Sequence, residues 1–303
     1  MPTHALLSGS YVDARGEPMT TELASDPIIV YGAPRSGTTY LQRLLSSHPD
    51  VFISDETRVF AWLHEALKLT QDHRFLANDG EAVETHLRVA LPQAIREFYA
   101  ARAPGVHHWG DKNPHYADPY NKGCLELVAD LFPGSRFIHI IRDGRDVASS
   151  LVRKEWEGKP WVSFEDAHRT WKRHLEIGRA FGETLPDSRY FELRYEALVA
   201  DDTAIPREMF GFLELDFHPE VEAFCRAQQE ERTPFRGPTR DLRQGVNSSD
   251  WAHVFTPKDQ ERSLRMIGSE LVETGYETVA SLARLREDVA ARQGAPDTPQ
   301  PSR

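Results

Sequence analysis

The sequence predicts an α/β protein with three layers, in which a central parallel sheet is flanked by helices. Short apolar runs that are typical of buried parallel strands occupy residues 28–31, 137–141 and 189–193. The first two are followed by segments with helical spacing, and further helices are predicted over 166–182 and 203–215. Strands that alternate with helices are typical of a parallel sheet covered on both faces.

The first predicted strand is joined to its helix by a glycine-bounded loop, Gly32 to Gly37, within the stretch IIVYGAPRSGTTYLQRLL. This order aims backbone N–H groups and the positive end of a helix dipole at one point, which favours an anion such as phosphate. The hydroxyls of Ser36, Thr38 and Thr39 can add donors or cap the helix. The glycine spacing is that of a Walker A loop, so the predicted fold is of the P-loop type.

The loop departs from that of a nucleoside triphosphatase at one position. Thr38 stands where such enzymes carry a lysine that reaches the β- and γ-phosphates, and Arg35 lies inside the loop instead. A tight turn without a ligand is the alternative, but an arginine is an unusual choice for a buried structural turn. The loop is therefore predicted to hold a phosphate group that does not belong to a triphosphate.

A second anion site is predicted in the stretch RFIHIIRDGRDVASSL, residues 136–151. Arg142 falls at the carboxyl end of the predicted strand, and Ser150 falls about two turns into the next helix. Ligands of open α/β sheets bind outside the carboxyl ends of the strands, so Arg142 is expected to face the same crevice as the first loop. The alternative is a surface arginine paired with Asp143 or Asp146.

Together the two segments resemble the 5′-phosphosulfate and 3′-phosphate motifs of sulfotransferases that use 3′-phosphoadenosine 5′-phosphosulfate (PAPS). In that family an arginine at a strand end and a serine eight residues later bind the 3′-phosphate, and Arg142 and Ser150 keep this interval. Further segments are most similar to the tyrosylprotein sulfotransferase branch, and they run in the family's order from about Pro27 to Trp251: SSHPDVFISDETRVF, GDKNPHY, LRYEAL and VNSSDW. Arg35 also favours this branch, because cytosolic small-molecule sulfotransferases usually carry lysine there.

The resemblance implies three catalytic side chains besides a serine described below. Arg35 is expected to neutralise the transferring and leaving oxygens, because its guanidinium stays charged and can bind them in pairs. Lys112, in GDKNP, matches the family's second cation, and Glu56, in the ETR triplet, matches its general base. Asp55, next to it, and His115 are the alternative bases.

The resemblance also implies how the donor is held. Its phosphosulfate end is assigned to the loop residues Arg35, Ser36, Gly37, Thr38 and Thr39. Lys154, or Arg153 one residue earlier, is a further cation for the 3′-phosphate, beside Arg142 and Ser150. Tyr195 matches a nucleotide contact of the family, although it could simply pack the following helix. Ser249 matches a catalytic serine at the donor's phosphate end, and Ser248 could replace it. For Lys112, the alternative is a solvated side chain paired with Asp111.

Length and composition bound the remaining possibilities. The 303 residues favour one domain over 25–290, preceded by an irregular arm, 1–24, and followed by a proline-rich tail, 291–303, that is expected to be disordered. A net charge of −11 argues against a nucleic-acid surface and against docking on anionic membranes. We expect a cytoplasmic protein, since no stretch is typical of a signal peptide or a membrane span, and two cysteines allow one disulfide at most.

The sequence thus predicts an enzyme, a PAPS-dependent sulfotransferase that needs no metal. Its acceptor is expected to be a hydroxyl of a small molecule or peptide, either phenolic (tyrosyl) or alcoholic. The animal tyrosylprotein enzymes carry membrane anchors, which leaves a protein substrate open here. Aromatic residues around Trp62 and Trp156 could line the acceptor pocket, and the oligomeric state is not predicted. A P-loop kinase or NTPase, and a nucleotide-binding protein without turnover, are the alternatives.

Overall fold

The computed structural model describes residues 23, 25–70, 79–156, 159–160, 162–200, 203–230 and 250–293. Most of the predicted N-terminal arm lies outside these residues. The same holds for the predicted tail, apart from its first residues, which complete the last helix, α13 (Val279–Gln293).

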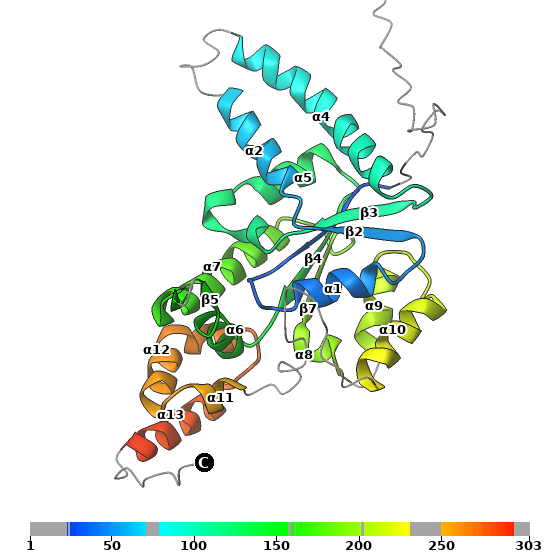
Figure 1. Ribbon diagram of the computed structural model, residues 1–303. Helices are drawn as coiled ribbons and strands as arrows, with labels where there is room; N and C mark the ends of the chain where they lie inside the picture. The colour runs from blue at the N-terminus through cyan, green and yellow to red at the C-terminus, as the bar shows by residue number, and fades with distance from the viewer. Residues whose placement is uncertain are drawn as a thin grey trace, which may run out of the picture.

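A five-stranded sheet forms the centre of the fold (Figure 1), and its strand order is β2-β3-β1-β4-β7. Every neighbouring pair in this sheet is parallel, which confirms the predicted sheet. The strands are β1 (Ile28–Tyr31), β2 (Val51–Asp55), β3 (His108–Lys112), β4 (Arg136–Ile141) and β7 (Tyr190–Arg194). The last of them begins one residue later than predicted.

Helices cover both faces of the sheet, and the side chains of β1 alternate between them. Ile28 and Val30 pack into one apolar core, and Ile29 and Tyr31 into the other. The first core is covered by α1 (Thr38–Leu45), α8 (Tyr195–Leu198), α9 (Ala204–Phe212) and α10 (Pro219–Glu230). The second is covered by α2 (Val59–Thr70), α4 (Gly80–Arg102), α5 (Cys124–Leu131) and α7 (Phe164–Gly182). A strand buried on both faces needs apolar residues at successive positions, which explains the uninterrupted run in its sequence.

A third apolar cluster lies at the lower left of Figure 1. It joins α6 (Gly144–Val152) and α7 to α11 (Asp250–Val254), α12 (Pro257–Glu273) and α13. Trp171, Trp251 and Ile267 are among its buried members. The remaining elements are the 3₁₀ turns η1 (Pro114–Ala117) and η2 (Pro119–Asn121) and an antiparallel pair, β5 (Glu155–Trp156) with β6 (Lys159–Pro160).

Both cysteines are buried free thiols, so the single disulfide that the sequence allowed is not formed. Burial raises the pKa of Cys124 to about 12 and that of Cys225 to about 11, which makes each thiol unreactive at neutral pH. Within the described ranges, we find no helix long and apolar enough to cross a bilayer.

Candidate active site

Five parts of the predicted site lie at the carboxyl edge of the sheet, each at the end of a different strand. Loop 32–37 follows β1, Glu56 follows β2, Arg142 follows β4 and Tyr195 follows β7, while Lys112 is the last residue of β3. From β1 the chain continues to β2, at one edge of the sheet, and after β3 it crosses over to β4, on the other side of β1. The ends of β1 and its two neighbours therefore form a topological switch point, where open α/β sheets bind ligands.

The loop after β1 has the backbone of an anion cradle. Arg35 has a φ of 74° and Gly37 a φ of 95°, and a Cβ at Gly37 would lie 2.3 Å from the Tyr195 ring. Gly37 is the N-cap of α1 and no side chain caps it, so the capping by serine or threonine that the sequence allowed is not observed. The Ser36 hydroxyl is buried and has no hydrogen-bond partner among the described residues. A strained arginine beside a buried unpaired hydroxyl is typical of a binding site.

The two sequence motifs contact each other through side chains. Arg35 Nε donates to Ser150 Oγ on α6 at 2.9 Å, and Arg142 Nη1 donates to the Arg35 carbonyl oxygen at 3.2 Å. The Arg142 guanidinium lies 4.8 Å from the centre of the Tyr195 ring, within cation–π range. Its Nε is buried and has no hydrogen bond in the described part of the chain. Two arginines and a serine therefore converge where a phosphate is expected.

The aspartates offered as alternative partners of Arg142 have other roles. Asp143 binds Arg145, whose Nη2 lies 2.6 Å from its carboxylate, and the Arg145 guanidinium stacks 4.4 Å from the centre of the Trp251 ring. Asp146 accepts a hydrogen bond from the Trp251 backbone N–H at 3.1 Å. Burial raises the pKa of Asp146 to about 6. These contacts fasten α11 to α6, and the idea of a surface ion pair for Arg142 is wrong.

Lys112 is the central cation of the site and is only 1% exposed. Its Nζ lies 2.8 Å from Glu56 Oε1 and 2.5 Å from Asp55 Oδ1. The same nitrogen donates to Thr39 Oγ1, at the start of α1, at 3.3 Å. Lys112 therefore connects the loop side of the site to both candidate bases, and the alternative of a solvated lysine paired with Asp111 is wrong.

The backbone that carries Glu56 is held by a buried network that the sequence analysis missed. Glu56 has a φ of 51°, and its N–H donates to the Lys112 carbonyl at 2.8 Å. The Asp111 carboxylate accepts hydrogen bonds from the next residue, Thr57, through its hydroxyl at 2.9 Å and its N–H at 3.3 Å. It also accepts from the hydroxyls of Ser54 and Tyr116. The sequence did hold one signal for this network. Successive residues of a strand face opposite sides, so Asp111 and Lys112, which are neighbours in β3, point to different sides of the sheet.

Other predicted residues are placed less centrally. Lys154 is exposed just beyond the end of α6, and Arg153 caps that helix by donating Nε to the Ser149 carbonyl at 3.3 Å. Ser248 and Ser249 lie outside the described residues. Trp62, on α2, is 69% exposed. The side chain of Trp156 lies outside the described part of the chain.

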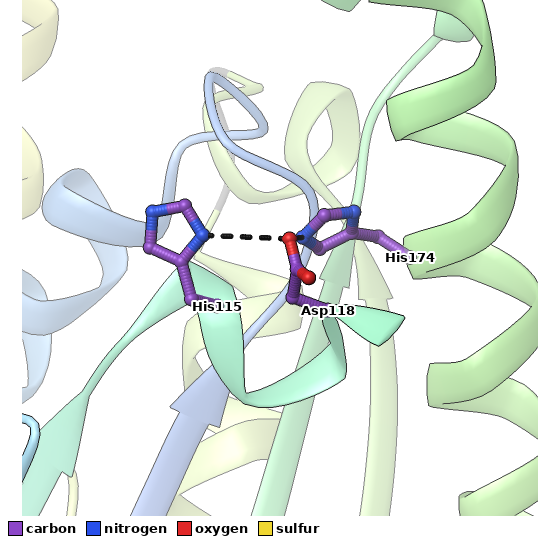
Figure 2. Close-up of side chains that lie close together, drawn as sticks. All are labelled: His115, Asp118 and His174. Atoms are coloured by element: carbon purple, nitrogen blue, oxygen red, sulfur yellow. Dashed lines mark ion pairs between the residues drawn. The ribbon is translucent and has the colours of Figure 1, made fainter. Parts of the chain in front are cut away.

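His115, the alternative base, belongs to another cluster. Its Nδ1 lies 3.7 Å from Asp118 Oδ2, and Figure 2 shows that this carboxylate stands between His115 and His174 on α7. The carboxylates that contact Lys112 are those of Asp55 and Glu56. The geometry thus favours a carboxylate over His115 as the base beside Lys112.

A sequence model described as "Sulfotransferase family" matches residues 27–219. The chain belongs to the sulfotransferase family. Protein-tyrosine sulfotransferase 1 of Danio rerio is 23% identical over 295 residues, covering 91% of this chain and 81% of the relative. Its Homo sapiens counterpart is 24% identical over 268 residues, covering 84% and 70%, and a Drosophila melanogaster protein-tyrosine sulfotransferase is 26% identical over 200 residues, covering 64% and 39%. These relatives confirm the expected position near the tyrosylprotein branch.

Solved structures confirm the fold. The sulfotransferase domain of the Synechococcus PCC 7002 olefin synthase superposes with a TM-score of 0.53 at 19% identity, covering 92% of this chain and 98% of that domain. Mouse sulfotransferase SULT7A1 complexed with PAP gives 0.50 at 14% identity, covering 88% and 89%. With the family match and the named relatives, the predicted enzyme class is confirmed: the protein is a sulfotransferase.

Proposed function

We propose that this sulfotransferase moves a sulfuryl group from PAPS to a phenolic hydroxyl, such as that of a tyrosyl residue, with Glu56 as the general base. The observation that carries the proposal is the buried Lys112, which contacts Glu56 on one side and Thr39 of the donor loop on the other. The phenolic acceptor is supported by relatives that are named protein-tyrosine sulfotransferases. The expectation of a cytoplasmic protein stays a prediction.

The residues at the carboxyl edge fit an anionic nucleotide. Ser36 Oγ and Arg142 Nε are buried donors without partners among the described residues, and a side chain at Gly37 would collide with the Tyr195 ring. The loop N–H groups would hold the phosphosulfate end, while Arg142 and Ser150 would hold the 3′-phosphate. Lys154 or Arg153 would add positive charge at the end of α6, and Tyr195 would hold the Arg142 guanidinium through its ring face.

When bound, the donor supplies the sulfuryl group and a phosphate leaving group. The acceptor oxygen forms a bond to sulfur while the bond from sulfur to the 5′-phosphate oxygen breaks, and 3′,5′-adenosine bisphosphate leaves. Glu56 accepts the proton of the acceptor hydroxyl. A carboxylate is a weak base towards a phenol, so this proton moves late, once the attacking oxygen has lost its charge to sulfur.

The two cations stabilise the negative charge that develops during transfer. Lys112 is held between Glu56 and Thr39. It would bind the oxygen that links sulfur to the 5′-phosphate of the donor. Arg35 neutralises the phosphate oxygens and stays protonated throughout. Ser249 stays a predicted contact to the same end of the donor. Thr38 in place of the triphosphatase lysine, together with the family match, speaks against the kinase alternative.

Donor class is tested by calorimetry on the purified protein without added metal. Titration with 3′,5′-adenosine bisphosphate is expected to show saturable binding, whereas ATP with Mg²⁺ is expected to bind weakly. A preference for ATP with a metal requirement contradicts the proposed donor and restores the kinase alternative.

The base is tested by comparing Glu56→Gln with Asp55→Asn, since both carboxylates contact Lys112. With PAPS and a tyrosine-containing peptide or a simple phenol, Glu56→Gln is expected to lower kcat about 10²–10⁴-fold and to leave bisphosphate affinity unchanged. Asp55→Asn is expected to lower kcat far less. If the two outcomes are exchanged, Asp55 is the base.

A further inference from the structure

Three side chains outside the proposed active site form a separate cluster beside α7 (Figure 2). His115 lies on η1, Asp118 joins η1 to η2, and His174 projects from α7 towards them. Asp118 Oδ2 lies 3.7 Å from His115 Nδ1 and 3.9 Å from His174 Nε2. One potential ligand atom of each residue lies within 4.8 Å of the others.

The buried imidazole of His174 has a nitrogen without a hydrogen bond. Its Nδ1 donates to the Thr170 carbonyl at 2.7 Å, so the proton of the neutral ring is on that nitrogen. Its Nε2 faces the cluster and finds no hydrogen-bond partner among the described residues, although the side chain is only 1% exposed.

His168, on the same helix, shows what a purely structural histidine looks like. Its Nδ1 contacts the Phe164 carbonyl at 2.8 Å, in the same way as His174 contacts Thr170. Its Nε2, however, is bonded to Ser263 Oγ at 2.8 Å, so both ring nitrogens are satisfied. Buried polar atoms normally have a hydrogen-bond partner. In His174 this rule is broken by one nitrogen only, the Nε2 that faces Asp118.

We propose that His115, Asp118 and His174 bind a divalent transition-metal ion of the zinc type. Two imidazoles and a carboxylate are ligands that zinc accepts, with water or substrate at a fourth position. A ligating histidine typically donates its other N–H to a carbonyl, as His174 does to Thr170.

The two distances to Asp118 require only a small contraction, and the three potential ligand atoms lie within 4.8 Å of one another. Ligand atoms about 2.1 Å from a tetrahedral ion lie about 3.4 Å apart, somewhat less than the 3.7 Å and 3.9 Å seen here. His115, whose side chain is 36% exposed, can move inward to close the third side. The bound ion would connect η1 to α7. Because only Asn113 separates η1 from Lys112, this connection would help to position Lys112.

A second histidine–aspartate group provides an internal control. The backbone N–H of His107 donates to Asp50 Oδ1 at 2.9 Å, and the imidazole Nδ1 of His107 lies 2.6 Å from the same oxygen. The imidazole therefore already has a hydrogen-bond partner. The neighbouring His108 Nε2 lies 3.9 Å from the same carboxylate. His107→Ala removes a histidine from this group and leaves the proposed metal site intact.

The test is a calorimetric titration of the full chain with ZnCl₂, after bound metal has been removed with EDTA. A second titration uses Co²⁺ as a spectroscopic probe. The wild-type protein is expected to bind one ion per chain and to show the visible absorption of low-coordinate Co²⁺. Zn²⁺ at a hundredfold excess over Kd is expected to raise Tm by about 5 °C. Asp118→Asn and His115→Ala are expected to weaken binding at least about tenfold.

Asp118→Asn is the most informative variant, because an amide oxygen can still accept the Tyr120 N–H that Asp118 Oδ1 now accepts at 2.9 Å. Local structure is therefore kept while the anionic ligand is lost. The proposal is wrong if binding is not saturable at one ion per chain, if Asp118→Asn binds as tightly as wild type, or if His107→Ala abolishes binding. These measurements use no donor or acceptor, so their outcome is independent of the proposed sulfuryl transfer.

Discussion

Asp146 links the helix of the proposed 3′-phosphate site to α11, and its ionisation is expected to cost stability. Its side chain is 1% exposed, and one carboxylate oxygen has no hydrogen bond among the described residues. Burial is the main reason why its pKa rises from 3.8 to about 6, and Asp143 adds to the rise, while the Trp251 N–H and Arg142 oppose it. Replacing Asp146 with asparagine keeps an oxygen for the Trp251 N–H and removes the charge.

The sign follows from linkage. A carboxyl whose pKa is higher in the folded protein favours folding while it is protonated, so its contribution is lost as pH rises from the unfolded pKa through the folded one. The difference between 3.8 and about 6 corresponds to ~3 kcal/mol at ~1.36 kcal/mol per pKa unit. Asp146→Asn is therefore expected to gain stability relative to wild type by ~0.5 kcal/mol at pH 4, ~1.6 kcal/mol at pH 5 and ~3 kcal/mol above pH 7.

Urea unfolding of both proteins between pH 4 and pH 8 measures this difference. Its change with pH is the decisive quantity, because any fixed effect of the new amide shifts all points equally. Asp166→Asn is the control, since Asp166 is exposed and its pKa is lowered by hydrogen bonds from Ser163 and Arg169. This variant is expected to gain no stability at neutral pH. A difference between Asp146→Asn and wild type that stays constant from pH 4 to pH 8 refutes the reasoning.

Three further variants test the proposed active site. Arg142→Ala is expected to weaken binding of 3′,5′-adenosine bisphosphate by about 1.5–3 kcal/mol and to leave binding of adenosine 5′-monophosphate unchanged in calorimetry, and an equal loss for both ligands contradicts the assignment to the 3′-phosphate. Gly37 has a φ of 95°, and a Cβ there would meet the Tyr195 ring, so Gly37→Ala is expected to lower bisphosphate affinity at least about tenfold. Gly105→Ala is the control, because Gly105 has a φ of 83° but open space around it, and this variant is expected to lose stability only. Equal bisphosphate affinities of the two variants would show that the loop does not need Gly37. Asp111→Asn is expected to lower the unfolding free energy by about 2–4 kcal/mol and kcat with it, while donor affinity stays the same, and an unaltered kcat would mean that the network does not position Glu56.

Local patterns explain why the positions of the loop after β1 and of Arg142 could be predicted from the sequence. The loop from Gly32 to Gly37 lies between a strand and a helix that adjoin it in the chain, so its direction follows from its own sequence. Arg142 lies at a strand end for the same reason. Because parallel strands share their carboxyl edge, Arg142 was expected to face the crevice of the first loop, and its Nη1 donates to the Arg35 carbonyl oxygen there.

Long-range contacts explain what could not be predicted. Lys112 contacts Glu56 across neighbouring strands, and no local pattern in GDKNP shows which carboxylate it binds. Asp111 was named only as the alternative partner of Lys112, and strand alternation turns it to the opposite side, where it binds Thr57. The clustering of His115 with His174 likewise depends on how α7 packs against η1, which separate elements of sequence do not show.

The order of the strands divides the enzyme into two parts that can change separately. β1, β4 and β7 carry the groups assigned to the nucleotide, whereas β2 and β3 carry Glu56, the proposed base, and Lys112, which is proposed to bind the oxygen between sulfur and phosphate. In Figure 1, α2 and α4 rise on the side of β2 and β3, away from α6 and α11. Under the proposed function, a change of acceptor is therefore expected to involve the side of β2 and β3 and to leave β1, β4 and β7 unchanged, provided that the contact from Lys112 to Thr39 is kept.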